Sequence, residues 1–203
     1  MSRRDRQPRQ RLDPRSRREA ILAAAAEVFA RSGYTAATMT AIAARADASE
    51  ALVYKYFTGK DQLYAEIVRL AIDDLLTRQS EALNALADGV PVRDRVRAAT
   101  VVYLDHIAHH PAAWALPLQR PGSEPPLAAR IRGHARRDYV GRLGSLLATR
   151  ADRRHEYALW GYFGFLDSAC VHWVEKGCPD DDRWPLIDAA LGALEGALGD
   201  WAA

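Results

Sequence analysis

Residues 38–60 read TMTAIAARADASEALVYKYFTGK, and this stretch decides the architecture of the first part of the chain. Apolar and small side chains recur at spacings of three and four from Met39 to Ala46, which is the pattern of one helix face. The pattern breaks at Asp47, a residue type that tolerates a left-handed backbone better than most. Ser49 follows where a helix N-cap belongs, because its hydroxyl can accept a hydrogen bond from an unpaired backbone N–H. The stretch therefore predicts two short helices joined by a tight turn.

The helix predicted after Ser49 has two different faces. Val53 and Phe57 form an apolar stripe at i, i+4, and the other side carries Glu50, Ala51, Tyr54 and Lys55. Such a helix fits the reading element of a helix-turn-helix, which lies in the major groove of DNA. The alternative is a pair of short helices in a bundle that never meets DNA. The next residues favour DNA, because Lys60 stands beside a predicted helix start capped by Asp61, and such a start is a good phosphate site.

The same stretch resembles the N-terminal domain of the TetR family of bacterial repressors, over roughly residues 16–70. The matching residues are Gly33, Tyr34, Thr38, Met39, Ile42, Ala43, Ala46, Ser49, Tyr54, Tyr56, Phe57, Gly59 and Lys60. Two positions depart from the family's pattern. Asp47 stands where the family usually has glycine, and Leu52 stands where it has a small residue or threonine. The leucine implies an apolar contact in place of a polar one, for instance with a thymine methyl group.

The helix faces and the resemblance together predict the DNA contacts. Tyr54 and Lys60 are expected on phosphates, and Thr38 and Thr40 on phosphates or a base edge. Residues 50–52 and Lys55 are expected to face base edges. The full predicted set is Thr38, Thr40, Ser49, Glu50, Ala51, Leu52, Tyr54, Lys55, Tyr56 and Lys60.

Composition narrows the protein class. The chain has 203 residues, 49% of them hydrophobic, which is long enough for a sizeable core. It lacks an apolar run near the ~18 residues that a membrane helix needs, and its first residues do not resemble a signal peptide. We therefore expect a cytoplasmic protein that does not bind membranes. Cys170 and Cys178 are expected to be free thiols, because cysteines in a reducing compartment rarely form disulfides.

Charge is distributed unevenly along the chain. Residues 1–60 carry 12 Lys and Arg against 6 Asp and Glu, a net +6, and the rest carries 16 against 20, a net −4. The basic part coincides with the predicted DNA-binding element, as an electrostatic footprint would, although a solvated basic tail is the alternative. We predict a disordered basic arm over 1–14, which leaves its contact with DNA open, a DNA-binding domain over 15–60, and a ligand-binding and dimerisation domain over 61–203.

Helical periodicity continues to the end of the chain, so the predicted fold class is all-α, with about nine helices in a TetR-like arrangement. A capping box at Ser16 and Glu19 is predicted to open the first helix, and Gly33 to end it. Pro111 is expected to end a later helix. The further helices are predicted over 61–87, 92–109, 127–148, 152–176 and 184–198, with Leu63, Ile67, Leu70, Leu75, Leu83 and Leu86 buried in the first of these.

Signals for catalysis or a cofactor are weak. His106, His109 and His110 can share a helix face, but imidazoles in the last turn of a helix also complement its dipole, and the spacing marks no distant ligand. The sequence lacks a nucleophile elbow, a Walker loop and a dinucleotide fingerprint. We therefore predict no enzyme activity, no metal and no cofactor.

The later helices carry many rings and a few isolated polar groups. Such a pattern is usually plain core, but it can also bind an apolar or aromatic ligand, and the resemblance favours a ligand because TetR-family domains house an inducer there. The predicted ligand residues are Tyr103, His106, Trp114, Tyr157, Trp160, Phe163 and Asp167. Glycines permit close helix approach, and the family pairs through two such helices, so the predicted dimer residues are Gly161, Gly164, Gly192 and Gly196.

The sequence thus predicts a homodimeric transcriptional regulator, most simply a repressor that binds a palindromic double-stranded DNA operator and is released by a small apolar or aromatic inducer. Two other classes stay open. One is a helical enzyme or metal-binding protein that uses the C-terminal bundle, and the other is a protein that coats DNA without sequence preference. The operator, the regulated genes, the ligand and the direction of its effect do not follow from the sequence.

Overall fold

The computed structural model describes residues 13–148 and 153–199, and within these ranges it contains nine α-helices, one short 3-10 helix and no β-strand. The prediction of an all-α protein is therefore confirmed. The described residues form two compact units, which we call the head unit, ending at Tyr64, and the bundle unit, beginning at Ala65. The domain boundary predicted after Lys60 lies earlier than this division, because Tyr64 still packs edge-on against Phe29 with ring centroids 5.1 Å apart.

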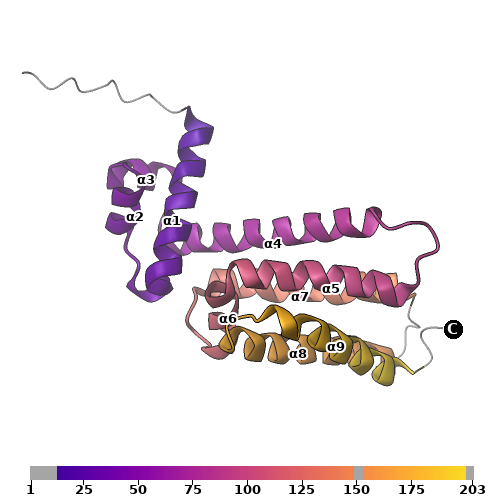
Figure 1. Ribbon diagram of the computed structural model, residues 1–203. Coiled ribbons are helices and arrows are strands. Elements are labelled where there is room, and N and C mark those ends of the chain that lie inside the picture. The colour runs from indigo at the N-terminus through magenta and orange to yellow at the C-terminus, as the bar shows by residue number, and fades with distance from the viewer. Residues whose placement is uncertain (1–12, 149–152, 200–203) are drawn as a thin grey trace, which may run out of the picture. The chain divides into compact units, whose positions relative to one another are not determined.

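The head unit consists of three helices and the first turn of a fourth. They are α1 (Pro14–Ala36), α2 (Met39–Arg45), α3 (Glu50–Tyr56) and the start of α4 (Lys60–Asn84). In Figure 1, α2 and α3 lie together beside α1. Their shared core is closed to solvent and contains Ile21, Ile42, Val53, Phe57 and Leu63, each at most 1% exposed. This core fixes α3 on the scaffold of α1.

Local signals in the helix-turn-helix stretch act as predicted. Ser49 accepts a hydrogen bond from the Leu52 N–H at 3.2 Å, and Thr38 accepts one from the Ala41 N–H at 3.1 Å. Asp47 adopts a left-handed backbone with φ of 47°. Gly33, at φ of 71°, interrupts α1, as a helix-ending glycine should.

The start of α1 differs from the prediction. Asp13 is the N-cap and accepts hydrogen bonds from the N–H groups of Arg15 at 2.9 Å and Ser16 at 3.1 Å, while the Ser16 hydroxyl donates to Asp13. Pro14 occupies the first helical position, where its fixed φ suits the helix, so the helix gains a turn before the predicted capping box. Pro14 thus belongs to α1 and Asp13 caps it, and the rest of the predicted arm lies outside the described residues.

The start of α4 also differs from the prediction. Gln62 accepts hydrogen bonds from the Thr58 N–H at 2.6 Å and the Thr58 hydroxyl at 3.0 Å, so these two residues organise the helix start. Asp61, the predicted cap, instead accepts a hydrogen bond from the Tyr34 hydroxyl. The partner of Asp61 lies 27 positions away in the sequence, which local capping rules do not consider.

The bundle unit contains the remainder of α4 together with α5 (Val92–His109), α6 (Pro111–Gln119), α7 (Pro126–Leu146), α8 (Arg153–Glu175), the 3-10 helix η1 (Asp180–Asp182) and α9 (Arg183–Leu198). Figure 1 shows α8 and α9 side by side, and α5 packs on both. Pro111 begins α6 directly after α5, because the first helical position tolerates proline. Leu70, predicted to be buried, is 43% exposed. Among the described residues we find no helix long and apolar enough to span a bilayer.

Candidate functional site

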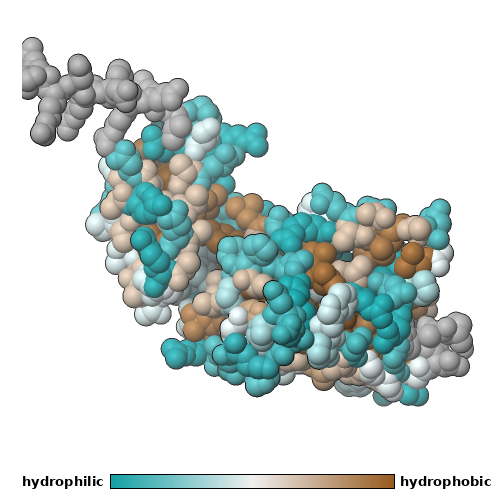
Figure 2. Space-filling model, viewed as in Figure 1, coloured by the Kyte–Doolittle hydropathy of each residue, from teal (hydrophilic) through white to brown (hydrophobic). Residues whose placement is uncertain are grey.

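The solvent-facing side of α3 carries the side chains that the sequence predicted for DNA. Glu50, Ala51, Tyr54 and Lys55 are exposed, with Tyr54 half exposed at 50%, whereas Leu52 and Tyr56 are partly buried. Thr38, Thr40 and Ser49 are also exposed, at the first turn of α2 and the cap of α3. Seven of the predicted residues are thus open to solvent. We call the exposed side of α3, with Glu50, Ala51, Tyr54 and Lys55, the α3 face. Figure 2 shows mostly hydrophilic and intermediate side chains on the visible side of the head unit.

Anchors behind the α3 face keep it rigid. An ion pair joins Arg45 of α2 to Glu27 of α1, with N–O distances of 2.5 and 2.6 Å. The Arg18 guanidinium lies 4.9 Å from the centre of the Phe57 ring, a cation–π arrangement at the end of α3. Because these contacts tie α2 and α3 to α1, the head unit can present α3 as a fixed element.

Lys60, which is predicted to contact a phosphate, already has partners within the head unit. Its ammonium donates hydrogen bonds to the carbonyl oxygens of Ala37 at 3.0 Å and Thr35 at 3.3 Å, and it lies 4.5 Å from the centre of the Tyr34 ring. Since these carbonyls directly precede the Thr38 cap, Lys60 fastens α4 to the α1–α2 turn. An ammonium has three N–H donors, so one remains for another acceptor.

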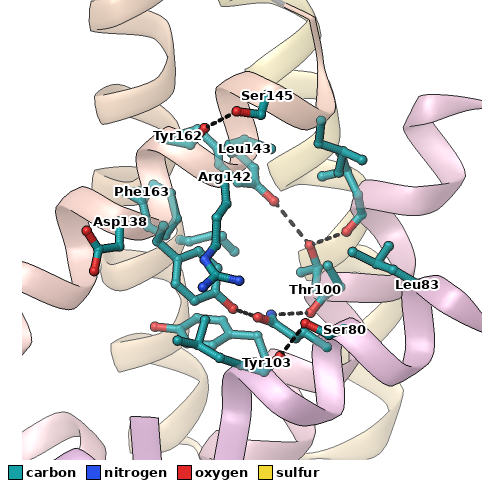
Figure 3. A pocket seen from close by; sticks show the side chains of 18 of the residues that line it. Ser80, Leu83, Thr100, Tyr103, Asp138, Arg142, Leu143, Ser145, Tyr162 and Phe163 are labelled. Carbon is teal, nitrogen blue, oxygen red and sulfur yellow. Dashed lines mark hydrogen bonds between the residues drawn. The ribbon is translucent and has the colours of Figure 1, made fainter. Parts of the chain in front are cut away.

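A large cavity of about 850 Å³ lies in the bundle unit between α4, α5, α7 and α8. Its walls are mostly apolar, and Figure 3 shows Phe163 on one side of the lining and Thr100 on the other, with Arg142 between them. Arg137, Asp138 and Arg142 are exposed lining residues from α7, so the charged groups stand at the rim. A cavity of this size and polarity fits a small molecule with a large apolar part.

Buried polar groups inside the large cavity are paired with one another. The hydroxyls of Thr100 and Tyr162 lie 3.1 Å apart, and burial raises the pKa of Tyr162 to about 12. Gln79, only 7% exposed, accepts a hydrogen bond from the Tyr139 hydroxyl and donates one to the Ala99 carbonyl at 2.8 Å. These groups are neutral at pH 7, so the interior offers hydrogen bonds without a net charge.

A smaller cavity of about 320 Å³ adjoins the large one. Three rings line both cavities, and we call Tyr103, Tyr139 and Phe163 the ring wall. The smaller cavity is also mostly apolar. It contains the ion pair of Arg132 with Glu124, at 3.0 Å, and that of Arg136 with Asp167, together with His106 and Trp114.

Two ionisable groups of the smaller cavity, His106 and Asp167, have shifted pKa values. Burial, followed by the nearby His110, lowers the pKa of His106 to about 4, so this imidazole is neutral at pH 7. Burial raises the pKa of Asp167, against the opposing effect of the Arg136 guanidinium. The Trp114 indole N–H donates to the Tyr103 hydroxyl at 3.1 Å, which connects α6 to the ring wall.

Five of the predicted ligand residues meet at these cavities: Tyr103, His106, Trp114, Phe163 and Asp167. The structure does not bring Tyr157 and Trp160 to them. Tyr157 is 74% exposed and Trp160 is 39% exposed, because both lie on the outer side of α8. The prediction missed Gln79, Thr100 and Tyr139. Gln79 carried a usable signal, since it is a polar residue on the apolar stripe between Leu75 and Leu83.

The outer sides of α8 and α9 form a surface of glycines and rings. Gly161, Gly164, Gly192 and Gly196 are exposed, and a Cβ added at any of them would meet no heavy atom within 4 Å. Tyr157, Trp160, Phe165 and Trp184, which is 60% exposed, flank these glycines. We call this surface the glycine–aromatic face. Exposed rings around gaps left by glycines are unusual on a surface that meets only water.

Comparison with known proteins gives matches in both sequence and structure. The family model described as "Bacterial regulatory proteins, tetR family" matches residues 21–67. The HTH-type transcriptional activator FasR of Mycolicibacterium smegmatis is 35% identical over 123 residues, which are 60% of this chain and 55% of FasR. The uncharacterized HTH-type transcriptional regulator YhgD of Bacillus subtilis is 28% identical over 94 residues, 46% of this chain and 48% of YhgD. The chain thus spans about half the length of the curated relatives that it matches.

Solved structures resemble nearly the whole chain. A tetR-family transcriptional regulator from Streptomyces coelicolor superposes with a TM-score of 0.72 at 22% identity, covering 92% of this chain and 80% of that one. The regulator FadR of Bacillus subtilis, solved in complex with stearoyl-CoA, gives a TM-score of 0.67 at 19% identity, covering 89% and 97%. At these identities the likeness concerns the fold.

Proposed function

We infer, since this chain belongs to the TetR family of bacterial regulatory proteins, that it controls transcription by reading a DNA sequence through its head unit. The observation that carries the proposal is the α3 face. Glu50, Ala51 and Lys55 stand exposed on a short helix whose opposite side is fixed in the core by Val53 and Phe57. A helix mounted in this way can enter a major groove with its first residues toward the base edges.

The proposed contacts follow from exposure. Thr38, Thr40 and Tyr54 contact phosphates, and Lys60 does so through its remaining N–H donor. These contacts position the head unit on DNA without reading the base sequence. Glu50, Ala51 and Lys55 contact base edges in the major groove. Leu52 is partly buried, so its contact is an apolar one, with a thymine methyl group. Ser49 acts as the cap that orients the reading helix, and Tyr56 packs beside it.

The glycine–aromatic face is the proposed dimer interface. Glycines let two helix backbones approach closely, and the flanking rings supply apolar area, so a second copy of the chain is the natural partner of α8 and α9. Two identical heads related by a two-fold axis read two identical half-sites. We therefore propose an operator that is an inverted repeat.

The large cavity is the proposed ligand site. Its apolar interior takes an apolar chain, and Arg137 and Arg142 at the rim suit an anionic head group, because guanidinium groups pair well with carboxylate and phosphate oxygens. The structural neighbour FadR, solved with stearoyl-CoA, supports a ligand of this class. The ligand that we propose is thus a long-chain carboxylate or its thioester, which replaces the broader apolar or aromatic molecule that the sequence predicted.

Repression is the proposed mode of control, with release by the ligand. A dimer on an operator blocks other proteins by occupancy alone, whereas activation needs a further surface for a partner. The relative FasR is named an activator, so a promoter–reporter assay in cells with and without the protein distinguishes the two modes. Lower reporter output with the protein supports repression, and higher output contradicts it.

Selection from random DNA duplexes, followed by sequencing, tests the proposed function. We expect an enriched inverted repeat that binds ~10³-fold or more tightly than a shuffled duplex of the same composition. A protein that coats DNA would bind both duplexes equally, and enrichment of directly repeated half-sites would contradict the two-fold dimer. The remaining alternative is a metal-binding bundle, and a metal analysis of the purified protein tests it.

A further inference from the structure

The ring wall lines both cavities, and the smaller one differs from the large one by its two ion pairs. Tyr139 and Phe163 pack edge to face with ring centroids 5.3 Å apart, and Tyr103 lies 6.4 Å from Tyr139. These rings come from α7, α8 and α5, and each lines both the large and the smaller cavity, so they stand where the two cavities meet. Both linings are largely apolar, and that of the smaller cavity contains two ion pairs.

Contacts on each ring hold the wall in place. The Tyr139 hydroxyl donates to Gln79, whose amide is in turn fixed to the Ala99 carbonyl at 2.8 Å. Phe163 is 8% exposed and packs against Tyr162 with ring centroids 5.9 Å apart. The Tyr103 hydroxyl accepts the Trp114 N–H from the far side. To move Tyr139 aside would break its hydrogen bond and leave the side-chain oxygen of Gln79 without this donor, which is unfavourable.

We propose that the ring wall sets the maximum chain length of the ligand, with Tyr139 and Phe163 as the residues that determine this specificity. The inference rests on the proposed function, in which the large cavity takes an apolar chain. A chain short enough to end at the wall buries every methylene. A longer chain must either leave its outer end in water or push between the rings, and there its tip would desolvate the paired groups Asp167 and Glu124.

A series of saturated straight-chain carboxylates from hexanoate to octadecanoate tests this inference. Each buried methylene contributes about 0.8 kcal/mol, so the affinity of the wild type should rise about fourfold per methylene and then stop rising at one chain length. Tyr139→Ala and the milder Phe163→Leu open the wall, and we expect the rise to continue to longer chains in both variants.

Two control variants isolate the wall. Tyr139→Phe removes the hydrogen bond to Gln79 but keeps the ring, which still packs against Phe163 and Tyr103, so the limiting chain length should not change. Leu83→Ala removes bulk from the large cavity, and Leu83 does not belong to the ring wall, so it should alter the affinity for all chains without moving the limit. Circular dichroism confirms that each variant used is folded.

Trp114 gives a second readout, because it lines the smaller cavity and its ring lies 6.0 Å from that of Tyr103. Carboxylates with a terminal bromine quench nearby tryptophans. In Tyr139→Ala and in Phe163→Leu, we expect these carboxylates to quench the fluorescence of Trp114, and in the wild type we expect no such quenching. The contribution of Trp114 is the part of the quenching that disappears when Trp114→Phe is added to each protein.

The outcomes separate the inference from the proposed function. A longer limit in the open variants, with unchanged limits in both controls, supports the inference. The same limit in wild type and open variants, or equal quenching of Trp114 in all of them, overturns it while the proposed ligand class stands. A wild type that binds none of the carboxylates, or their coenzyme A thioesters, overturns both.

Discussion

Lys60 combines two roles at one residue, and its substitution tests them together. Its ammonium holds the Thr35 and Ala37 carbonyls and retains a donor for phosphate. We expect Lys60→Ala to weaken binding to the selected duplex and to a shuffled duplex by the same factor, and to lower the slope of log affinity against log salt by about one phosphate contact. Gel-shift titrations at several salt concentrations measure both effects.

Lys55 is the matched comparison, since it is a lysine on the α3 face itself. Lys55→Ala should cost about 1–3 kcal/mol on the selected duplex and relax specificity at particular base pairs, because a base contact is lost. If Lys60→Ala changed the preference for one sequence, or if both variants bound as the wild type does, the assignment of the α3 face would be wrong.

His106 makes the stability of the bundle unit depend on pH. Its pKa falls from the ordinary 6.5 to about 4 in the folded protein, because burial disfavours the charged imidazole. The unfolded chain therefore binds a proton between these values while the folded chain does not, and the free energy of unfolding decreases as the pH falls from 6.5 toward 4.

Substitution of His106 by glutamine removes this titration. Urea unfolding of the wild type should lose about 1–3 kcal/mol more than His106→Gln over that interval, with a difference that vanishes above pH 7. A wild type that loses less stability than the variant on acidification would show that the imidazole is protonated in the folded state.

At the scale of elements, the cap of α3 links the turn to the reading helix. Ser49→Ala removes the acceptor for the Leu52 N–H and should destabilise the head unit by about 1 kcal/mol. DNA affinity should fall with it, because the first turn of α3 carries the base-reading residues. Thr77→Ala, in the middle of α4 where the hydroxyl only bonds the Asp73 carbonyl, is the control and should leave DNA affinity and thermal stability nearly unchanged.

Local chemistry made most elements predictable from the sequence. Ser49, Asp47 and Gly33 act through their own backbone and near neighbours, so their roles follow from residue type. Local rules failed where two readings compete at one residue. Pro111 can end one helix or begin the next, and Asp13 followed by Pro14 displaced the capping box at Ser16 because both sites offer a cap.

Contacts between residues that are distant in the sequence could not be predicted from it. The bonds of Lys60 to residues 25 and 23 positions earlier depend on how α1 folds back, which no spacing encodes. Periodicity placed the rings of α8 on the helix but could not separate Phe163, which is buried, from Tyr157 and Trp160, which face outward. A helix with apolar residues on two sides is expected to pack on two other elements, but its sequence does not say which elements these are. The cavities belong to the packing of four or more helices and appear only with the fold.

At the scale of the whole molecule, the proposed dimer depends on glycines that the subunit itself does not need. A Cβ at Gly164 meets no heavy atom within 4 Å, and replacing a glycine inside a helix favours the helix by up to about 1 kcal/mol. Gly164→Leu should therefore preserve the folded subunit but block close approach of two copies. We expect sedimentation to change from dimer to monomer at micromolar concentration.

The control for this prediction is Ala113→Leu, which adds the same kind of bulk on an exposed position of α6. It should remain dimeric and bind the selected duplex as the wild type does, whereas Gly164→Leu should lose affinity for an inverted repeat. A dimeric Gly164→Leu protein would place the interface elsewhere on the bundle unit.

We propose that a ligand in the large cavity controls the head unit through α4, the helix that belongs to both units. The most direct measurement is a titration of the selected duplex into the protein, with and without a saturating carboxylate that fills the large cavity, followed by the reverse titration. We expect the carboxylate to weaken duplex binding by ~5–150-fold and the duplex to weaken carboxylate binding by the same factor, because the coupling free energy is shared. Equal affinities in the presence and absence of the other ligand would contradict the claim, since the cavity would then be occupied without any effect on the head unit.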